Sequence, residues 1–98
     1  MRVVLLNRAE GHLRDGFYWY EKQDPGAGEH FLRHMLSEIE SLAQLAGIHR
    51  KVHGLHRLIP DRFPFGIYYR ITGDTVEVAA VMDQRRRPAW IRRELGRR

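Results

Sequence analysis

Arginine is the side chain most strongly concentrated in one part of this sequence. Residues 85–93 hold five arginines and one tryptophan: Arg85, Arg86, Arg87, Arg92, Arg93 and Trp90. Guanidinium groups stay protonated at any working pH, so they bind carboxylates or phosphates and do not transfer protons. Arginine and tryptophan are also common anchors of protein interfaces. The cluster therefore predicts a site for an anionic partner, and the simplest alternative is a solvated face that keeps the protein soluble.

Side chains that could transfer a proton are few in this part of the chain. The candidates are His53, His56, Tyr68 and Asp83, and no tyrosine, histidine or lysine follows Arg85. General acid–base catalysis needs such a group within hydrogen-bond reach of the reacting atoms. The sequence therefore offers few side chains that could act as a general acid or base beside the arginine cluster.

Two groups of histidines have spacings that could suit a metal. One is His49, His53 and His56, and the other is His30, His34 and Glu38 at helical spacing. Neither stands in a recognised metal motif, and the chain has no cysteine, which also excludes disulfides and thiolate nucleophiles. We expect core or solvated histidines, no metal and no cofactor.

Charge divides the chain into two unlike halves. Residues 1–46 hold 5 Lys and Arg against 7 Asp and Glu, whereas residues 47–98 hold 12 against 5. A basic C-terminal half attracts a polyanion or an acidic protein.

No apolar run is long enough to span a bilayer, and the N-terminus does not resemble a secretory signal. We expect one domain over residues 1–98, located in the cytoplasm and not bound to membranes.

The elements that position these residues can be predicted from hydrophobic periodicity. A short apolar run at residues 3–6 predicts a buried strand, and helical spacing predicts a helix over 8–22 with Asn7 and Glu10 as its capping pair. A second apolar stripe predicts a helix ending near Gly47. A polar segment over 48–53 is expected to be a loop.

Alternating residues predict three further strands, at 55–59, 65–71 and 76–82, and the last two flank the turn residues 72–75. In the last strand the pattern places Val76, Val78, Ala80 and Met82 on one face. Pro88 is expected to begin a short terminal helix.

The predicted fold is α+β with the order β-α-α-β-β-β and a short C-terminal helix. A helical hairpin packs on one face of a mainly antiparallel four-stranded sheet. The other face, which carries Arg57, Tyr68, Arg70 and, at its edge, Arg62, is expected to be open and basic.

Three segments in this order resemble the RelE/ParE superfamily of bacterial type II toxins, and the resemblance is closer to the ParE-like branch. The segments are W-Y-E-x-Q-x-P-G-x-G-x-x-F at residues 19–31, R-F-P-F-x-I-Y-Y-x-I at 62–71, and the tail from Val78 to Ile91. Together they cover nearly the whole chain. Many relatives have a histidine where this chain has Asp83, which weakens the transfer of an acid–base role to that position.

The resemblance implies a toxin held inactive by an acidic antitoxin, in a hetero-oligomer of the kind associated with plasmid stabilisation. It implies growth inhibition by binding and poisoning DNA gyrase. We assign target binding to Arg85, Arg86, Arg87 and Trp90, although Trp90 could simply dock the terminal helix. Antitoxin binding is assigned to Arg57, Tyr68, Arg70, Tyr18 and Trp19.

Two alternatives to a gyrase inhibitor stay open. The first is a metal-independent, ribosome-dependent endoribonuclease that cuts messenger RNA, with Arg57, Arg62, Arg85 and Tyr68 around the phosphate. The second is a nonspecific nucleic-acid binder, which explains the charge but not the segment at 19–31.

Overall fold

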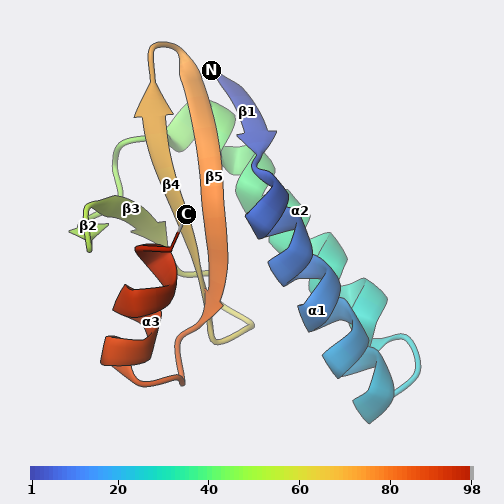
Figure 1. Ribbon diagram of the computed structural model, residues 1–98. Helices are drawn as coiled ribbons and strands as arrows, with labels where there is room; N and C mark the ends of the chain where they lie inside the picture. Colours follow the sequence, from blue (N-terminus) through green and yellow to red (C-terminus); the bar gives the residue numbers. More distant parts are fainter. Residues whose placement is uncertain (98) are drawn as a thin grey trace.

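The computed structural model describes residues 1–97, which form a sheet with helices on both of its faces (Figure 1). The elements in chain order are β1 (Arg2–Leu5), α1 (Asn7–Gln23), α2 (Ala27–Leu45), β2 (Lys51–Val52), β3 (Leu55–Leu58), β4 (Phe65–Thr72), β5 (Thr75–Asp83) and α3 (Pro88–Leu95). The predicted α+β class, helical hairpin and terminal helix are confirmed. None of the helices in the described part of the chain is long and apolar enough to cross a membrane.

The sheet has the strand order β1-β5-β4-β3-β2. β1 pairs in parallel with β5, and the remaining pairs are antiparallel. The expected four strands are joined by a fifth, β2, which lies in the segment predicted to be a loop. Its two residues pair with β3, so that the polar segment forms the edge of the sheet. An edge strand this short and basic resists pairing with another chain.

The hairpin of β4 and β5 is the centre of the sheet. Thr72 pairs with Thr75 across a two-residue turn, as the turn residues predict. A bulge interrupts the pairing, because Tyr68 lies opposite Ala80 whereas Tyr69 lies opposite Val78. The extra residue on β5 reverses the faces of all residues after it. The prediction that Ala80 and Met82 share a face with Val76 and Val78 is therefore wrong.

The corner between α1 and α2 is built around Glu21. Its carboxylate accepts hydrogen bonds from the backbone N–H groups of Gly26, at 3.2 and 3.1 Å, and of Gly28, at 3.0 Å. The helices approach so closely here that a Cβ atom on Gly28 would lie 2.5 Å from the carbonyl oxygen of Phe17. The glutamate and glycines of the segment at 19–31 thus have a structural role.

The two ends of the helical hairpin differ in how well the sequence predicted them. α2 ends before Gly47, which has a φ of +99°, so the predicted termination is confirmed. α1 begins one residue earlier than predicted, because Leu6 is the N-cap and no side chain caps it. The predicted capping pair of Asn7 and Glu10 does not form. Instead the backbone N–H of Glu10 donates to the carbonyl of Leu6.

The central part of the sheet is buried on both faces. One face packs under α1 and α2 in the main core, which includes Phe31, Ile67, Tyr69 and Val78. The other face is covered by α3, in a second cluster of Tyr68, Ala80, Met82 and Ile91 (Figure 1). The expectation that this second face is open is therefore wrong at Tyr68, whereas Arg70 on the same face is exposed. Tyr68 retains only 1% of its surface exposed.

Candidate binding surface at the end of the last strand

The arginine cluster lies in the turn that joins β5 to α3. The backbone N–H of Arg86 donates to the carbonyl of Asp83 at 3.2 Å, which reverses the chain after the strand. Arg87 is the N-cap of α3, and Pro88 follows it in the first turn, where proline needs no hydrogen-bond donor. The turn therefore separates the arginines that the sequence places side by side.

Arg86 and Arg87 belong to the side of the sheet that α3 covers. They line a hollow of about 350 Å³ together with Ala89, Trp90 and Arg93. The Cζ atom of Arg86 lies 3.7 Å from the centroid of the Trp90 ring, a close cation–π contact. Three guanidinium groups around one indole form a site that suits carboxylate or phosphate groups on a partner.

Trp90 also docks the terminal helix, as the alternative interpretation expected. It is half-buried and packs against the cluster formed by Tyr68, Ala80, Met82 and Ile91. The same side chain thus fixes α3 to the sheet and supports Arg86. Docking and binding are compatible roles for this residue.

Arg85 lies on the opposite side of the strand end, near α1. Its partner Asp83 pairs across the hairpin with Phe65, a residue of the main core, which assigns Asp83 to the helical-hairpin face. Arg85 donates from Nε to Oδ1 of Asp83 at 3.0 Å and from Nη2 to Oδ2 at 2.9 Å. Its Cζ atom lies 5.8 Å from the ring centroid of Trp19. This hydrogen-bonded pairing holds the pKa of Asp83 below its usual range and raises the pKa of Arg85.

Arg57 and Tyr68 form a polar cluster with Gln84, a residue that the sequence analysis did not single out. Arg57 donates from Nη1 to Oε1 of Gln84 at 3.0 Å, and Nε2 of Gln84 donates to the hydroxyl of Tyr68 at 3.1 Å. Gly66 makes room for this contact, because a Cβ atom there would lie 2.8 Å from Nε2 of Gln84. The one signal in the sequence was a glycine inside a strand, which often marks close approach of another group.

The remaining candidate residues lie apart: Arg62, which was named for the nuclease alternative, and Arg70, Tyr18 and Trp19, which were assigned to antitoxin binding. Arg62 is exposed in the loop between β3 and β4. Arg70 lies towards the other end of β4, where its Nε donates to Glu77 at 2.6 Å, and this bond holds the pKa of Glu77 low. Tyr18 and Trp19 are 58% and 50% exposed on α1. The residues assigned to antitoxin binding therefore lie at several separate places on the surface and do not form one patch.

The residues suggested for nuclease chemistry are divided between the two faces of the sheet. Arg57 and Tyr68 face α3, whereas Asp83 and Arg85 lie on the hairpin side. His56 pairs with Tyr69 and stacks on its ring at 5.0 Å, on the face opposite Arg57. His53 lies in the turn between β2 and β3, with a φ of 55°. The two histidines are therefore not positioned beside the arginine cluster.

The histidines serve the packing of the fold. His30 and His34 lie against Phe63, with ring centroids 5.6 and 5.5 Å apart. Nδ1 of His49 forms a hydrogen bond of 2.6 Å with the hydroxyl of Tyr69. Within residues 1–97, the structure brings together no three His, Cys, Asp or Glu side chains that could hold a metal ion.

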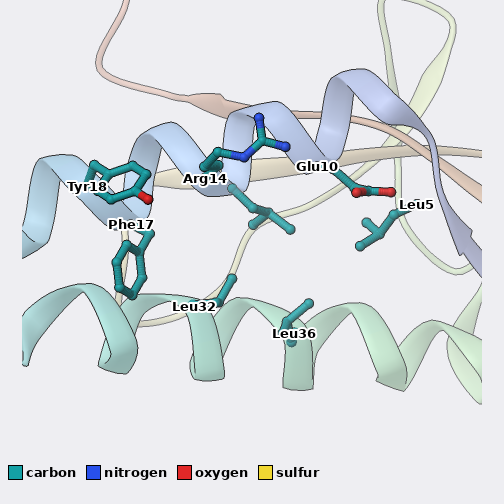
Figure 2. Close-up of a pocket in the computed structure, with 8 residues that line it drawn as sticks. Leu5, Glu10, Arg14, Phe17, Tyr18, Leu32 and Leu36 are labelled. Atoms are coloured by element: carbon teal, nitrogen blue, oxygen red, sulfur yellow. The ribbon is translucent and has the colours of Figure 1, made fainter.

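An apolar groove of about 390 Å³ runs between α1 and α2 on the outer side of the helical hairpin (Figure 2). Figure 2 shows Phe17 of α1 directed towards α2, with Leu32 and Leu36 directed back from α2. Glu10, Arg14 and Tyr18 also line the groove. The groove thus has an apolar floor and charged groups beside it, which suits an amphipathic segment of a protein partner.

Comparisons with known proteins agree with this architecture. A family model described as "ParE toxin of type II toxin-antitoxin system, parDE" matches residues 3–88. A solved structure described as the chromosomal ParDE TA system from P. aeruginosa superposes with a TM-score of 0.78 at 20% sequence identity, covering 85% of this chain and 95% of that one. A search of curated protein sequences gave no significant match.

Proposed function

The chain belongs to the ParE toxin family of type II toxin–antitoxin systems, and from this premise we propose that it arrests growth by binding and poisoning DNA gyrase. The proposed contact surface is the end of the sheet, formed by Arg85, Arg86, Arg87 and Trp90. Arg93, which lines the same hollow, is added to it. In its inactive form the toxin is bound by an acidic antitoxin in a cytoplasmic hetero-oligomer.

The observation that carries this proposal is the hollow formed by Arg86, Arg87 and Arg93 around Trp90. Arginine and tryptophan supply most of the energy of many protein interfaces when they lie in a partly desolvated pocket. The indole is held by the packing of α3, so that Arg86 is presented on a rigid support. A rigid anchor loses less conformational entropy when it binds.

The positions of the alternative catalytic residues also favour a binding role. A nuclease that uses the 2′-hydroxyl as nucleophile needs a base, an acid and cations converging on one phosphate. Here Arg57 and Arg85 lie on different sides of the strand end, and Tyr68 is buried beneath α3. This arrangement supports inhibition by contact over cleavage of messenger RNA.

For the antitoxin we propose two contact regions. An apolar segment of the antitoxin enters the groove between α1 and α2, which Tyr18 lines. Its acidic side chains meet Arg57 and Arg70 along the sheet. Trp19, which is exposed on α1, also contacts the antitoxin. Tyr68 contributes from below the surface, because it holds Gln84 and thereby Arg57.

A purified assay tests the gyrase proposal. The toxin is expected to block negative supercoiling by gyrase, or to accumulate cleaved DNA in its presence, while messenger RNA on ribosomes stays intact. Codon-phased cuts in ribosome-bound messenger RNA, with gyrase unaffected, would show that the endoribonuclease alternative is right.

Co-expression tests the antitoxin proposal. Expression of the toxin alone should arrest growth, and co-expression with the neighbouring antitoxin gene should restore it. The complex should survive purification at moderate salt, because apolar contacts in the groove supplement the charges. Complete dissociation at such salt would mean that the interface is only electrostatic and that the groove is not used.

A further inference from the structure

We propose that Asp83 is a positioning residue that holds Arg85 so that one edge of its guanidinium is presented to a carboxylate on the protein target. The inference rests on the proposed function, since it concerns how one arginine of the target-binding surface is held. It begins from an unusually complete set of contacts between these two neighbouring side chains.

Asp83 accepts three hydrogen bonds from Arg85. Two come from the side chain, from Nε and Nη2, and the third comes from the backbone N–H at 2.9 Å. The backbone bond closes a turn of the type that aspartate commonly forms with the residue two positions on. The carboxylate is therefore fixed by the turn, and the guanidinium is fixed by the carboxylate.

Trp19 restricts Arg85 from a second direction. Its ring centroid lies 5.8 Å from Cζ of Arg85, and it comes from the C-terminal part of α1, far from β5 in the sequence. The two contacts restrain the arginine at the junction of helix and strand, although the side chain is still 56% exposed. A long, exposed side chain would otherwise sample many rotamers and lose that freedom on binding.

The chemistry of the guanidinium decides what this arrangement can bind. Arginine has five N–H donors in one plane, and Asp83 uses one on Nε and one on Nη2. One hydrogen on Nη1 and the second hydrogen on Nη2 point outward in parallel and form another edge. Within the described residues, Asp83 is the only hydrogen-bond partner of this side chain. The remaining edge matches the two oxygens of a carboxylate, which arginine binds in a forked geometry.

The distribution of charge makes this role different from that of the neighbouring arginines. Asp83 neutralises the charge of Arg85, so long-range attraction at this position is weak. Arg86, Arg87 and Arg93 keep their charge around the hollow and supply attraction at a distance. Arg85 therefore orients the bound target, and its contribution to affinity depends on the geometry of the contact and only weakly on salt concentration.

A double-mutant cycle tests the proposal. The variants are Asp83→Ala, Arg85→Ala and the pair together, and their affinity for purified DNA gyrase is measured at about 0.3 M salt to screen the charge change. Asp83→Ala is expected to weaken binding about three- to tenfold when Arg85 is present, and to have no effect in the Arg85→Ala background. Arg85→Lys should behave like Arg85→Ala, because lysine cannot form the fork.

A matched control comes from the other exposed pair on the sheet. Glu77→Ala removes the partner of Arg70 at the opposite end of β4, and it should leave target affinity unchanged. Asp83→Asn provides a second variant with nearly the same shape, for use if Asp83→Ala proves unstable. Equal losses from Asp83→Ala in both backgrounds, or no loss with Arg85 present, would overturn the proposal.

Nuclear magnetic resonance separates failure of this inference from failure of the proposed function. The Nε–H of Arg85 should give a distinct, slowly exchanging signal in the wild type that is lost in Asp83→Ala. A wild-type protein that shows this signal but inhibits neither gyrase nor growth would overturn the proposed function and leave the positioning of Arg85 by Asp83 intact. Absence of the signal would overturn the positioning role of Asp83.

Discussion

Arg86 stacks on Trp90, with Cζ 3.7 Å from the ring centroid, and the same indole packs α3 against the sheet. The exposed arginine is thus fixed to the hydrophobic cluster that covers the second face of the sheet. A substitution in that cluster, for example at Ile91, is expected to displace Trp90 and with it Arg86. We therefore expect the stability of α3 and the proposed target binding to be coupled.

The corner of the helical hairpin should not tolerate a methyl group at Gly28. Gly28→Ala would place a Cβ atom 2.5 Å from the carbonyl oxygen of Phe17, so the helices must separate. We expect the free energy of unfolding to fall by about 1–3 kcal/mol, measured by urea denaturation. Gly11→Ala is the control, because that position in α1 has open space. The control should stabilise by about 0.5–1 kcal/mol. Equal effects of the two changes would contradict the close packing.

His12 should make the fold less stable in weak acid. Its Nδ1 accepts a hydrogen bond of 3.0 Å from the backbone N–H of Val81. Val81 lies in the part of β5 beyond Val78, where β1 no longer pairs with this strand. Burial and the charge of Arg8 lower the pKa of His12, while Asp15 and Glu94 oppose this change. The folded protein thus binds fewer protons than the unfolded chain. The contribution of neutral His12 to the free energy of unfolding should be fully present above about pH 6.5, and it should be lost as the pH drops through the pKa of His12 in the folded state.

His12→Asn provides the comparison, because asparagine offers an acceptor near the position of Nδ1 but does not titrate. Chemical denaturation between pH 5 and 8 should show a smaller loss of stability in this variant. Some loss should remain, because burial also lowers the pKa of His49. Identical pH profiles for variant and wild type would show that His12 is not responsible.

Arg8 should hold the end of α3. It donates from Nη1 to the carbonyl of Arg97 at 2.7 Å and from Nη2 to the carbonyl of Leu95 at 3.3 Å. Arg8→Ala should therefore speed hydrogen exchange at the amides of Gly96 and Arg97 about two- to tenfold, with little change in the main core. Arg33→Ala, which breaks an exposed pair with Glu29, should leave exchange in α3 unchanged. Unaltered exchange in Arg8→Ala would mean that apolar packing alone holds α3.

The parts of the fold that could be predicted from the sequence are those fixed by local chemistry. The turn at 72–75 and the helix end at Gly47 both follow from residue types that few other conformations accept. The bulge in β5 could not be predicted, because Ala79, Ala80, Val81 and Met82 are all apolar and do not reveal which of them faces which way. That run does indicate a strand covered on both faces, which is what the structure shows.

The candidate site was harder to predict because it depends on which side of the sheet each side chain reaches, and the spacing of residues in the sequence does not determine this. Arg85, Arg86 and Arg87 are adjacent in the sequence, yet the turn sends Arg85 towards Trp19 and Arg86 towards Trp90. The sequence allowed Trp90 to dock the terminal helix, but it did not show which face of the sheet α3 would cover, because the buried residues of α3 are few and stand among arginines. The role of Gln84 could not be predicted, because a single glutamine outside any repeating pattern or motif does not indicate which residues it contacts.

The most direct test of the account compares the wild type with the double variant Arg85→Ala, Arg86→Ala in the gyrase supercoiling assay. The double change removes two exposed guanidinium groups and no core volume, so circular dichroism and thermal melting should show an intact fold. Arginines at the energetic centre of an interface contribute about 2 kcal/mol or more, and we assign Arg85 and Arg86 to that centre, so the concentration needed for half-inhibition should rise at least about thirtyfold. Full inhibition by the folded double variant, or no inhibition of gyrase by the wild type, would contradict the account.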